Sequence, residues 1–120
     1  MKITEKEWTV LEVLWKNEKA ELGQITESLK KENGWSINTT HTYLTRMEAK
    51  GIVSIDKETV PHTYHAAVSK DECLRRERKS FLHRVYRGSA GDLITAFLKE
   101  EKISAEEVEK LKRLLEEMEV

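Results

Sequence analysis

The sequence predicts a mostly α-helical protein with one small β-hairpin, for three reasons. Apolar side chains recur at helical spacing in three segments of the first 51 residues. Between residues 52 and 68 the pattern changes to that of two short strands. After residue 69 the helical spacing returns and continues nearly to the end of the chain. We therefore expect an N-terminal domain over 1–68 and a helical dimerisation domain over 69–120.

The first two helices are indicated by their caps and their apolar spacing. Thr4 and Glu7 have the spacing of a capping box, in which each residue satisfies a backbone N–H of the other. The apolar positions that follow are Trp8, Leu11, Leu14 and Trp15 in the first helix and Leu22, Ile25 and Leu29 in the second. The second helix is expected to end near Asn33-Gly34.

The third helix, between Trp35 and Gly51, is the most informative segment. Ser36 is a typical N-cap and Gly51 a typical C-terminal residue. Its inward face carries Thr40, Tyr43, Leu44 and Met47, and its outward face carries Asn38, Thr42 and Thr45, flanked by His41 and Arg46. Short hydrogen-bonding side chains and a guanidinium suit base edges and phosphates. A solvated helix that is merely rich in Thr is the alternative interpretation.

The segment after Gly51 has the pattern of a hairpin. Ile52–Ile55 is β-branched and apolar, residues 56–61 form a polar turn, and residues 62–68 resemble a returning strand. Three helices followed by a hairpin is the order of a winged helix-turn-helix. In that fold the second helix of the motif enters the major groove of DNA.

The C-terminal half contains three further helical patterns. Ser69 with Glu72 opens a helix that continues to about Tyr86, residues 87–91 interrupt it, and Ser104 with Glu107 opens the last helix. The last two helices are too short to bury their apolar faces against each other. We expect them to pair with a second copy, although folding back on the N-terminal domain is an alternative. The expected dimerisation residues are Leu93, Ile94, Phe97, Leu98, Val108, Leu111, Leu115 and Met118, with Leu114 on the same helix.

Composition and charge limit the kinds of protein that this chain could be. The 120 residues contain 21 basic and 22 acidic side chains, a net charge of −1, and only residues 69–88 are clearly basic. A weak overall field predicts modest non-specific DNA affinity, with specificity resting on a few contacts. The single cysteine, Cys73, cannot form an intrachain disulfide, and we expect it to be an inert helix residue rather than a redox sensor. Without a signal peptide or a long apolar run, the chain is expected to be cytoplasmic and not inserted in a membrane.

The sequence contains none of the common catalytic motifs. We therefore expect no enzymatic activity and no cofactor. His62 and His65 are three residues apart on an expected strand and would point to opposite faces, so no metal site is predicted. The aromatic residues are expected to pack in cores: Trp8, Trp15, Trp35, Tyr43, Tyr64, Phe81 and Phe97.

Several segments of the chain resemble one known family. These segments are T-E-K-E-W-T-V-L-E-V-L-W at 4–15, W-S-I-N-T-T-H-T-Y-L-T-R-M-E-A-K-G at 35–51, H-T-Y-H-A at 62–66, F-L-H-R-V-Y-R-G-S at 81–89 and L-I-T-A-F-L-K-E-E at 93–101. The chain resembles the penicillinase and methicillin-resistance repressors, the BlaI/MecI family. The resemblance implies a homodimeric winged-helix repressor that binds palindromic operators in double-stranded DNA. It also implies relief of repression by proteolysis, triggered by a membrane-bound sensor protease that detects β-lactams.

The resemblance also implies roles for individual residues. The base-reading positions of the family fall on Asn38, Thr39, His41 and Thr42, and Arg46 falls on a phosphate-contact position. Thr45, on the same outward face, is expected at the DNA backbone. The regulatory cleavage bond corresponds to Ala96–Phe97. Asn38 and His41 replace basic residues of the best-known members, and Ala96 replaces an Asn.

Two other functions compete with the repressor. A winged-helix regulator controlled by a small ligand would need a pocket between the two halves of the chain, which nothing in the sequence marks. A winged-helix protein-interaction module without DNA binding is favoured by the nearly neutral charge of residues 1–68, which hold 9 basic and 10 acidic side chains.

Overall fold

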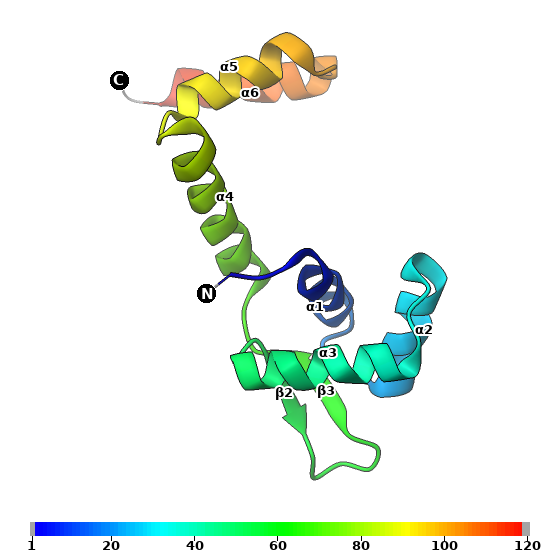
Figure 1. Cartoon of the computed structure of the whole chain (residues 1–120). Helices are drawn as coiled ribbons and strands as arrows, with labels where there is room; N and C mark the ends of the chain where they lie inside the picture. Colours follow the sequence, from blue (N-terminus) through cyan, green and yellow to red (C-terminus); the bar gives the residue numbers. More distant parts are fainter. Residues whose placement is uncertain (1, 119–120) are drawn as a thin grey trace. The chain divides into compact units, whose positions relative to one another are not determined.

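The computed structural model describes residues 2–118, in which six helices and one small sheet are present (Figure 1). The chain divides into two compact units, and the boundary along the sequence lies between Leu74 and Arg75. The elements in chain order are α1 (Glu5–Asn17), β1 (Ala20–Glu21), α2 (Leu22–Asn33), α3 (Ile37–Lys50), β2 (Val53–Asp56), β3 (Thr63–Ala66), α4 (Lys70–Tyr86), α5 (Ala90–Glu100) and α6 (Ala105–Glu117). The predicted fold class, mostly helical with a small β wing, is confirmed.

Helices α1 and α2 begin and end where local chemistry predicts. The hydroxyl of Thr4 accepts from the N–H of Glu7, whose carboxylate accepts from the N–H of Thr4, so the predicted capping box is present. Helix α2 ends at Gly34, which adopts the left-handed conformation at φ 70° and donates its N–H to the carbonyl of Lys30 over 3.1 Å. Because glycine adopts positive φ at little cost, it stops α2 and turns the chain toward α3.

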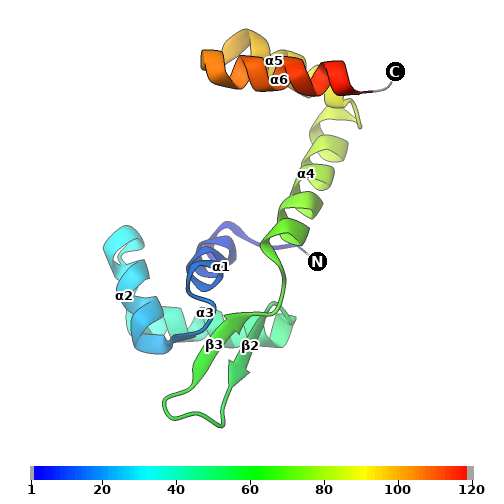
Figure 2. The ribbon, with the colours of Figure 1, turned by 180° about the vertical axis from the view of Figure 1, so that it is seen from behind.

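The sheet contains one strand more than the sequence predicts. Strand β3 lies in the centre and pairs antiparallel with both β1 and β2. Tyr64 of β3 lies opposite Ala20 on one side and Ile55 on the other. Strand β1 has only two residues, too few to show any alternation. The hairpin β2–β3 extends away from the helices in both views (Figures 1 and 2).

One hydrophobic core holds the first unit together. It is formed by buried residues from helices α1–α3, the three strands and the turn between α3 and β2: Val10, Leu11, Val13, Leu14, Ala20, Ile25, Leu29, Leu44, Met47, Ile52, Val53 and Tyr64. The indole N–H of Trp15 donates to the carbonyl of Val68 over 2.9 Å, which ties α1 to the segment after β3. The core therefore fixes α3 against α1, α2 and the sheet.

The second unit contains most of α4 together with α5 and α6, and many of its large apolar side chains are exposed. No residue of α5 or α6, both described in full, is buried. The predicted break between α4 and α5 is present, with Arg87 and Gly88 at positive φ. The predicted core packing of two aromatic residues is wrong for a single chain, because Phe81 is 37% exposed and Phe97 is 53% exposed. Helix α4 has one buried residue, Cys73, and α5 has none, so neither helix forms a core around these rings.

Candidate nucleic-acid interface

Helix α3 is capped at both ends. The Oγ of Ser36 accepts from the N–H of Thr39 over 3.2 Å. At the other end Gly51 has φ 86° and donates its N–H to the carbonyl of Glu48 over 3.0 Å. These are the residues that the sequence predicts for the two ends, so the helix has the predicted bounds.

The inward face of α3 packs into the core. Thr40, Leu44 and Met47 are fully buried. Burial of the Thr40 hydroxyl would be costly without a partner, but it donates to the carbonyl of Ser36 over 3.0 Å. Tyr43 is half-buried at the edge of this face. The orientation of α3 about its own axis is therefore set by apolar burial.

The outward face of α3 is polar and open to solvent. All six side chains that were predicted to contact DNA are exposed: Asn38, Thr39, His41, Thr42, Thr45 and Arg46. The helix thus brings them together on one continuous surface. Ile37, at the first position of the helix, is also 52% exposed. Sequence reasoning missed this residue because one apolar side chain at a helix start carries no periodic signal.

The hydroxyls of two threonines on this face, Thr42 and Thr45, share one geometry. The hydroxyl of Thr42 donates to the carbonyl of Asn38 over 2.9 Å, and that of Thr45 donates to the carbonyl of His41 over 3.0 Å. Each hydroxyl proton is occupied by the helix itself. What the side chains offer to a ligand is therefore an oxygen acceptor and a methyl group.

Arg46 is held against an aromatic ring. Its guanidinium carbon lies 5.8 Å from the centroid of the Tyr43 ring, within the range of a cation–π interaction. Within residues 2–118 no carboxylate forms an ion pair with Arg46. No carboxylate of the described residues therefore neutralises its positive charge.

A nearly buried ion pair joins the end of α3 to the start of α1. The Nζ of Lys50 lies 2.7 Å from Oε1 of Glu7, whose side chain is only 9% exposed, and Nζ also donates to the carbonyl of Lys2. Burial on its own would raise the pKa of Glu7, but the hydrogen bond from Lys50 and those from Thr4 outweigh it and lower the pKa below 4.5. The sequence gives no sign of this pair, since its members are 43 residues apart.

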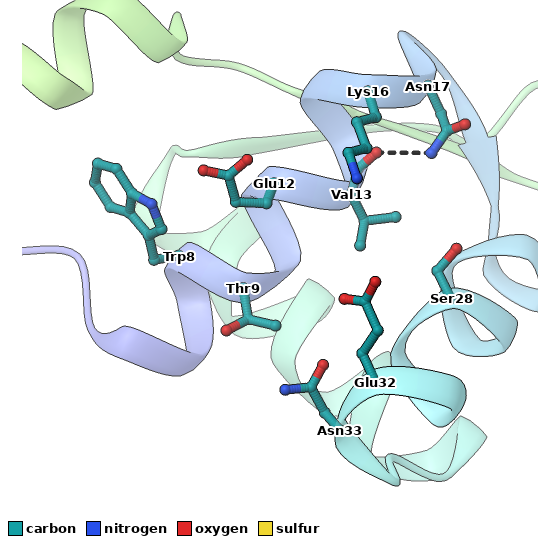
Figure 3. A pocket seen from close by; sticks show the side chains of 9 residues that line it. All are labelled: Trp8, Thr9, Glu12, Val13, Lys16, Asn17, Ser28, Glu32 and Asn33. Carbon is teal, nitrogen blue, oxygen red and sulfur yellow. Dashed lines mark hydrogen bonds between the residues drawn. The ribbon is translucent and has the colours of Figure 1, made fainter. Parts of the chain in front are cut away.

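A groove of about 320 Å³ lies between α1 and α2. Figure 3 shows Glu32 and Asn33 extending from α2 toward α1. Much of its lining is ionic or polar, with Glu12, Lys16 and Asn17 on α1 and Ser28 on α2. Small-molecule sites are mostly apolar and enclosed. This groove therefore gives little support to regulation by a small ligand.

The residues expected in dimerisation lie on α5, on α6 and at its end. Most are large apolar side chains that are exposed in the single chain: Ile94, Phe97, Leu98, Val108, Leu111, Leu115 and Met118. Leu93 is half-buried. Ala96 and Phe97, the expected cleavage bond, lie in the middle of α5, with Ala96 half-buried.

Two further features concern only the part of the chain that the structure describes. None of its helices is both long enough and apolar enough to cross a membrane. Among the same residues no three His, Cys, Asp or Glu side chains come together as a metal site would require. Cys73 is buried.

Comparison with known proteins decides the family. The profile of the family described as "Penicillinase repressor" matches residues 3–117. The chain belongs to the penicillinase repressor family. The resemblance seen in the sequence is therefore confirmed over nearly the whole chain.

Individual penicillinase repressors align along almost their full length. The penicillinase repressor of Bacillus licheniformis is 30% identical over 115 residues, which cover 96% of this chain and 90% of that protein. The methicillin resistance regulatory protein MecI of Mammaliicoccus sciuri is 28% identical over 113 residues, covering 94% and 92%. A solution structure of monomeric Bacillus licheniformis BlaI in complex with the blaP half-operator matches with a TM-score of 0.53 and 27% identity. That match covers 58% of this chain and 85% of the BlaI chain, and it supports the winged-helix fold.

Proposed function

We propose that this chain is a dimeric transcriptional repressor that binds a palindromic operator through α3. The observation that carries the proposal is the outward face of α3, where six polar side chains are exposed on a helix whose other face is buried. The solved complex of BlaI with the blaP half-operator supports DNA as the ligand. A helix fixed by a core and open on one polar side suits the major groove.

The proposed roles follow from the chemistry of each side chain. Asn38 can both donate to and accept from a base edge, and His41 offers one donor and one acceptor when neutral. The Thr42 oxygen can accept from a base amino group while its methyl group contacts a thymine methyl. Thr39 is proposed to read bases from the border of this face, and Thr45 and Arg46 are proposed to contact the DNA backbone.

Dimerisation is proposed to occur through the second unit. Large apolar side chains such as Ile94, Phe97 and Leu115 are exposed on α5 and α6, and large exposed apolar patches are typical of interaction sites. A second copy would cover these faces, and its two-fold symmetry would match the two halves of a palindrome.

Relief of repression is proposed to occur by cleavage between Ala96 and Phe97. This bond lies inside α5, so a protease needs a locally unfolded α5 to reach it. The shallow burial of α5 keeps the free energy of such opening low. The proposed signal route is a membrane-bound sensor protease system of the kind implied by the family.

Genomic footprint sequencing with the purified full-length chain, at two salt concentrations, tests the operator. A recurrent palindrome with half-sites about one helical turn apart supports a dimeric repressor. Retention of genomic DNA without any enriched sequence, or no retention even at low salt, contradicts it and favours a protein-interaction module.

Two variants separate the assigned roles. Arg46→Ala should weaken binding to all sequences alike and reduce its salt dependence, because a phosphate contact is lost. Thr42→Val keeps the shape of the side chain but removes the oxygen. It should lower the binding free energy by about 1–3 kcal/mol, and only through the base pair that Thr42 contacts. Equal losses of specific and non-specific binding in both variants would contradict these roles.

A further inference from the structure

Arg46 is the end of a stack of three side chains. Its guanidinium lies 5.8 Å from the centroid of the Tyr43 ring. Tyr43 lies in turn against Trp35, with ring centroids 4.9 Å apart and planes inclined by 38°. The stack thus leads from the turn between α2 and α3 to the outward face of α3.

The two aromatic rings pack against the hydrophobic core of the first unit. Trp35 and Tyr43 are both half-buried and pack against the buried cluster of the first unit. The backbone N–H of Trp35 donates to the carbonyl of Leu29 over 3.4 Å, which fixes the turn to the end of α2. Tyr43 and Arg46 are three residues apart on α3 and are neighbours on its surface. The position of the Tyr43 ring is therefore set before any ligand arrives.

Within residues 2–118 no hydrogen bond or ion pair uses an N–H of the Arg46 guanidinium, so its donors are available to a ligand. Stacking on an aromatic ring does not occupy the in-plane N–H donors of arginine, which match two phosphate oxygens. Arginine normally loses rotamer freedom when it binds a phosphate. A guanidinium that already rests on a ring loses less, so it binds more tightly for the same contacts.

We propose that Tyr43 and Trp35 are positioning residues that pre-order Arg46 as a clamp for a DNA phosphate. The inference rests on the proposed function, and it adds two aromatic residues to the DNA-binding machinery. They act through Arg46 and need no contact with DNA themselves.

A double-mutant cycle on the full chain tests the coupling. The probe is a duplex of random sequence at low salt, because a phosphate contact does not depend on the bases. Tyr43→Leu, which keeps apolar bulk but removes the ring, should weaken binding by about two- to fivefold. Tyr43→Phe keeps the ring and should restore nearly full affinity. On an Arg46→Ala background, Tyr43→Leu should cause no further loss.

A matched control breaks another aromatic pair in the same unit. Trp8 and Trp15 of α1 lie edge to face with centroids 5.7 Å apart. Trp8→Leu should lower the melting temperature as Tyr43→Leu does but leave DNA affinity unchanged. A loss of affinity in Trp8→Leu equal to that in Tyr43→Leu would show that lowered stability is the cause and would overturn the inference.

The order of Arg46 can also be measured without DNA. The Nε–H of Arg46 should show restricted motion by NMR relaxation in the wild type and in Tyr43→Phe, and free motion in Tyr43→Leu. A mobile Arg46 in the wild type, or additive losses in the double-mutant cycle, would overturn the inference while leaving the repressor proposal intact. A wild-type chain that binds no duplex would overturn both the inference and the repressor proposal. This outcome differs from the others because the wild type then has no measurable affinity with which the variants could be compared.

Discussion

Single residues fix the orientation of α3 relative to the rest of the first unit. The ion pair between Lys50 and Glu7 joins the last turn of α3 to the first turn of α1. Glu7 is also half of the capping box of α1, so its carboxylate accepts from both the Thr4 N–H and the Lys50 ammonium. One side chain therefore stabilises a helix end and holds the proposed reading helix in place.

Removal of the cation should destabilise the first unit. In Lys50→Met the nearly buried Glu7 carboxylate loses its charged partner, and we expect a cost of about 1–3 kcal/mol in the free energy of unfolding. Urea denaturation measures it. The matched control is Lys57→Met, which breaks a more exposed pair with Glu48 and should cost less than about 1 kcal/mol. Equal costs in the two variants would contradict the importance of burial.

The same carboxylate should make stability depend on pH. The pKa of Glu7 is lowered on folding, so the folded state favours the ionised form and gains stability above pH 4.5. That gain is lost as the pH falls from 4.5 through the lower folded pKa. Urea denaturation at a series of acidic pH values should therefore show a steeper fall for the wild type than for Glu7→Gln. Parallel curves would show that Glu7 does not contribute to the pH dependence.

At the scale of elements, the helices begin and end at residues whose side chains or backbone conformations favour a helix end. The caps at Thr4, Ser36 and Ser104 each accept a hydrogen bond from the backbone N–H three residues later. Gly34 and Gly51 both take the left-handed conformation that ends α2 and α3. Such signals lie within a few residues of the helix ends that they determine.

Replacement of a glycine that ends a helix should lower the stability of the protein, and replacement of a glycine inside a helix should not. Gly51 has φ 86°, so Gly51→Ala forces a side chain into a strained backbone and should cost about 1–2 kcal/mol. Gly23→Ala is the control, because Gly23 lies in α2 with open space around an added Cβ. It should be neutral or stabilise the protein by up to about 1 kcal/mol. Thermal denaturation distinguishes the two, and equal effects would contradict the assignment of strain.

These local signals explain what could and could not be predicted from the sequence. The six helices, the hairpin and the exposed face of α3 follow from periodicity and caps. Strand β1 did not, because two residues show no alternation and their pairing with β3 is a tertiary contact. The Lys50–Glu7 pair and the Trp35–Tyr43 stack depend on how α3 packs. No spacing rule along the chain determines that packing.

At the scale of the whole molecule, the two units differ in where their apolar residues lie. The first unit encloses a core around Leu11, Ile25 and Leu44. In the second unit the large apolar side chains of α5 and α6 are mostly exposed, with Leu115 at 62%. Large exposed apolar patches of this kind are typical of interaction surfaces. The proposed dimer would supply the missing cover.

The dimer can be tested together with its consequence for DNA. Phe97 is 53% exposed in the middle of α5, and Phe97→Asp would place a charge in the proposed interface. Sedimentation equilibrium should show a dimer for the wild type and a monomer for the variant. Val60→Asp is the control for oligomeric state, because Val60 lies between β2 and β3 and is 95% exposed. Because two linked half-sites bind with a higher effective concentration than one, Phe97→Asp should bind a full palindrome far more weakly while keeping wild-type affinity for an isolated half-site. A wild-type chain that stays monomeric at high concentration, or a Phe97→Asp chain that still dimerises, would contradict the assignment of this face.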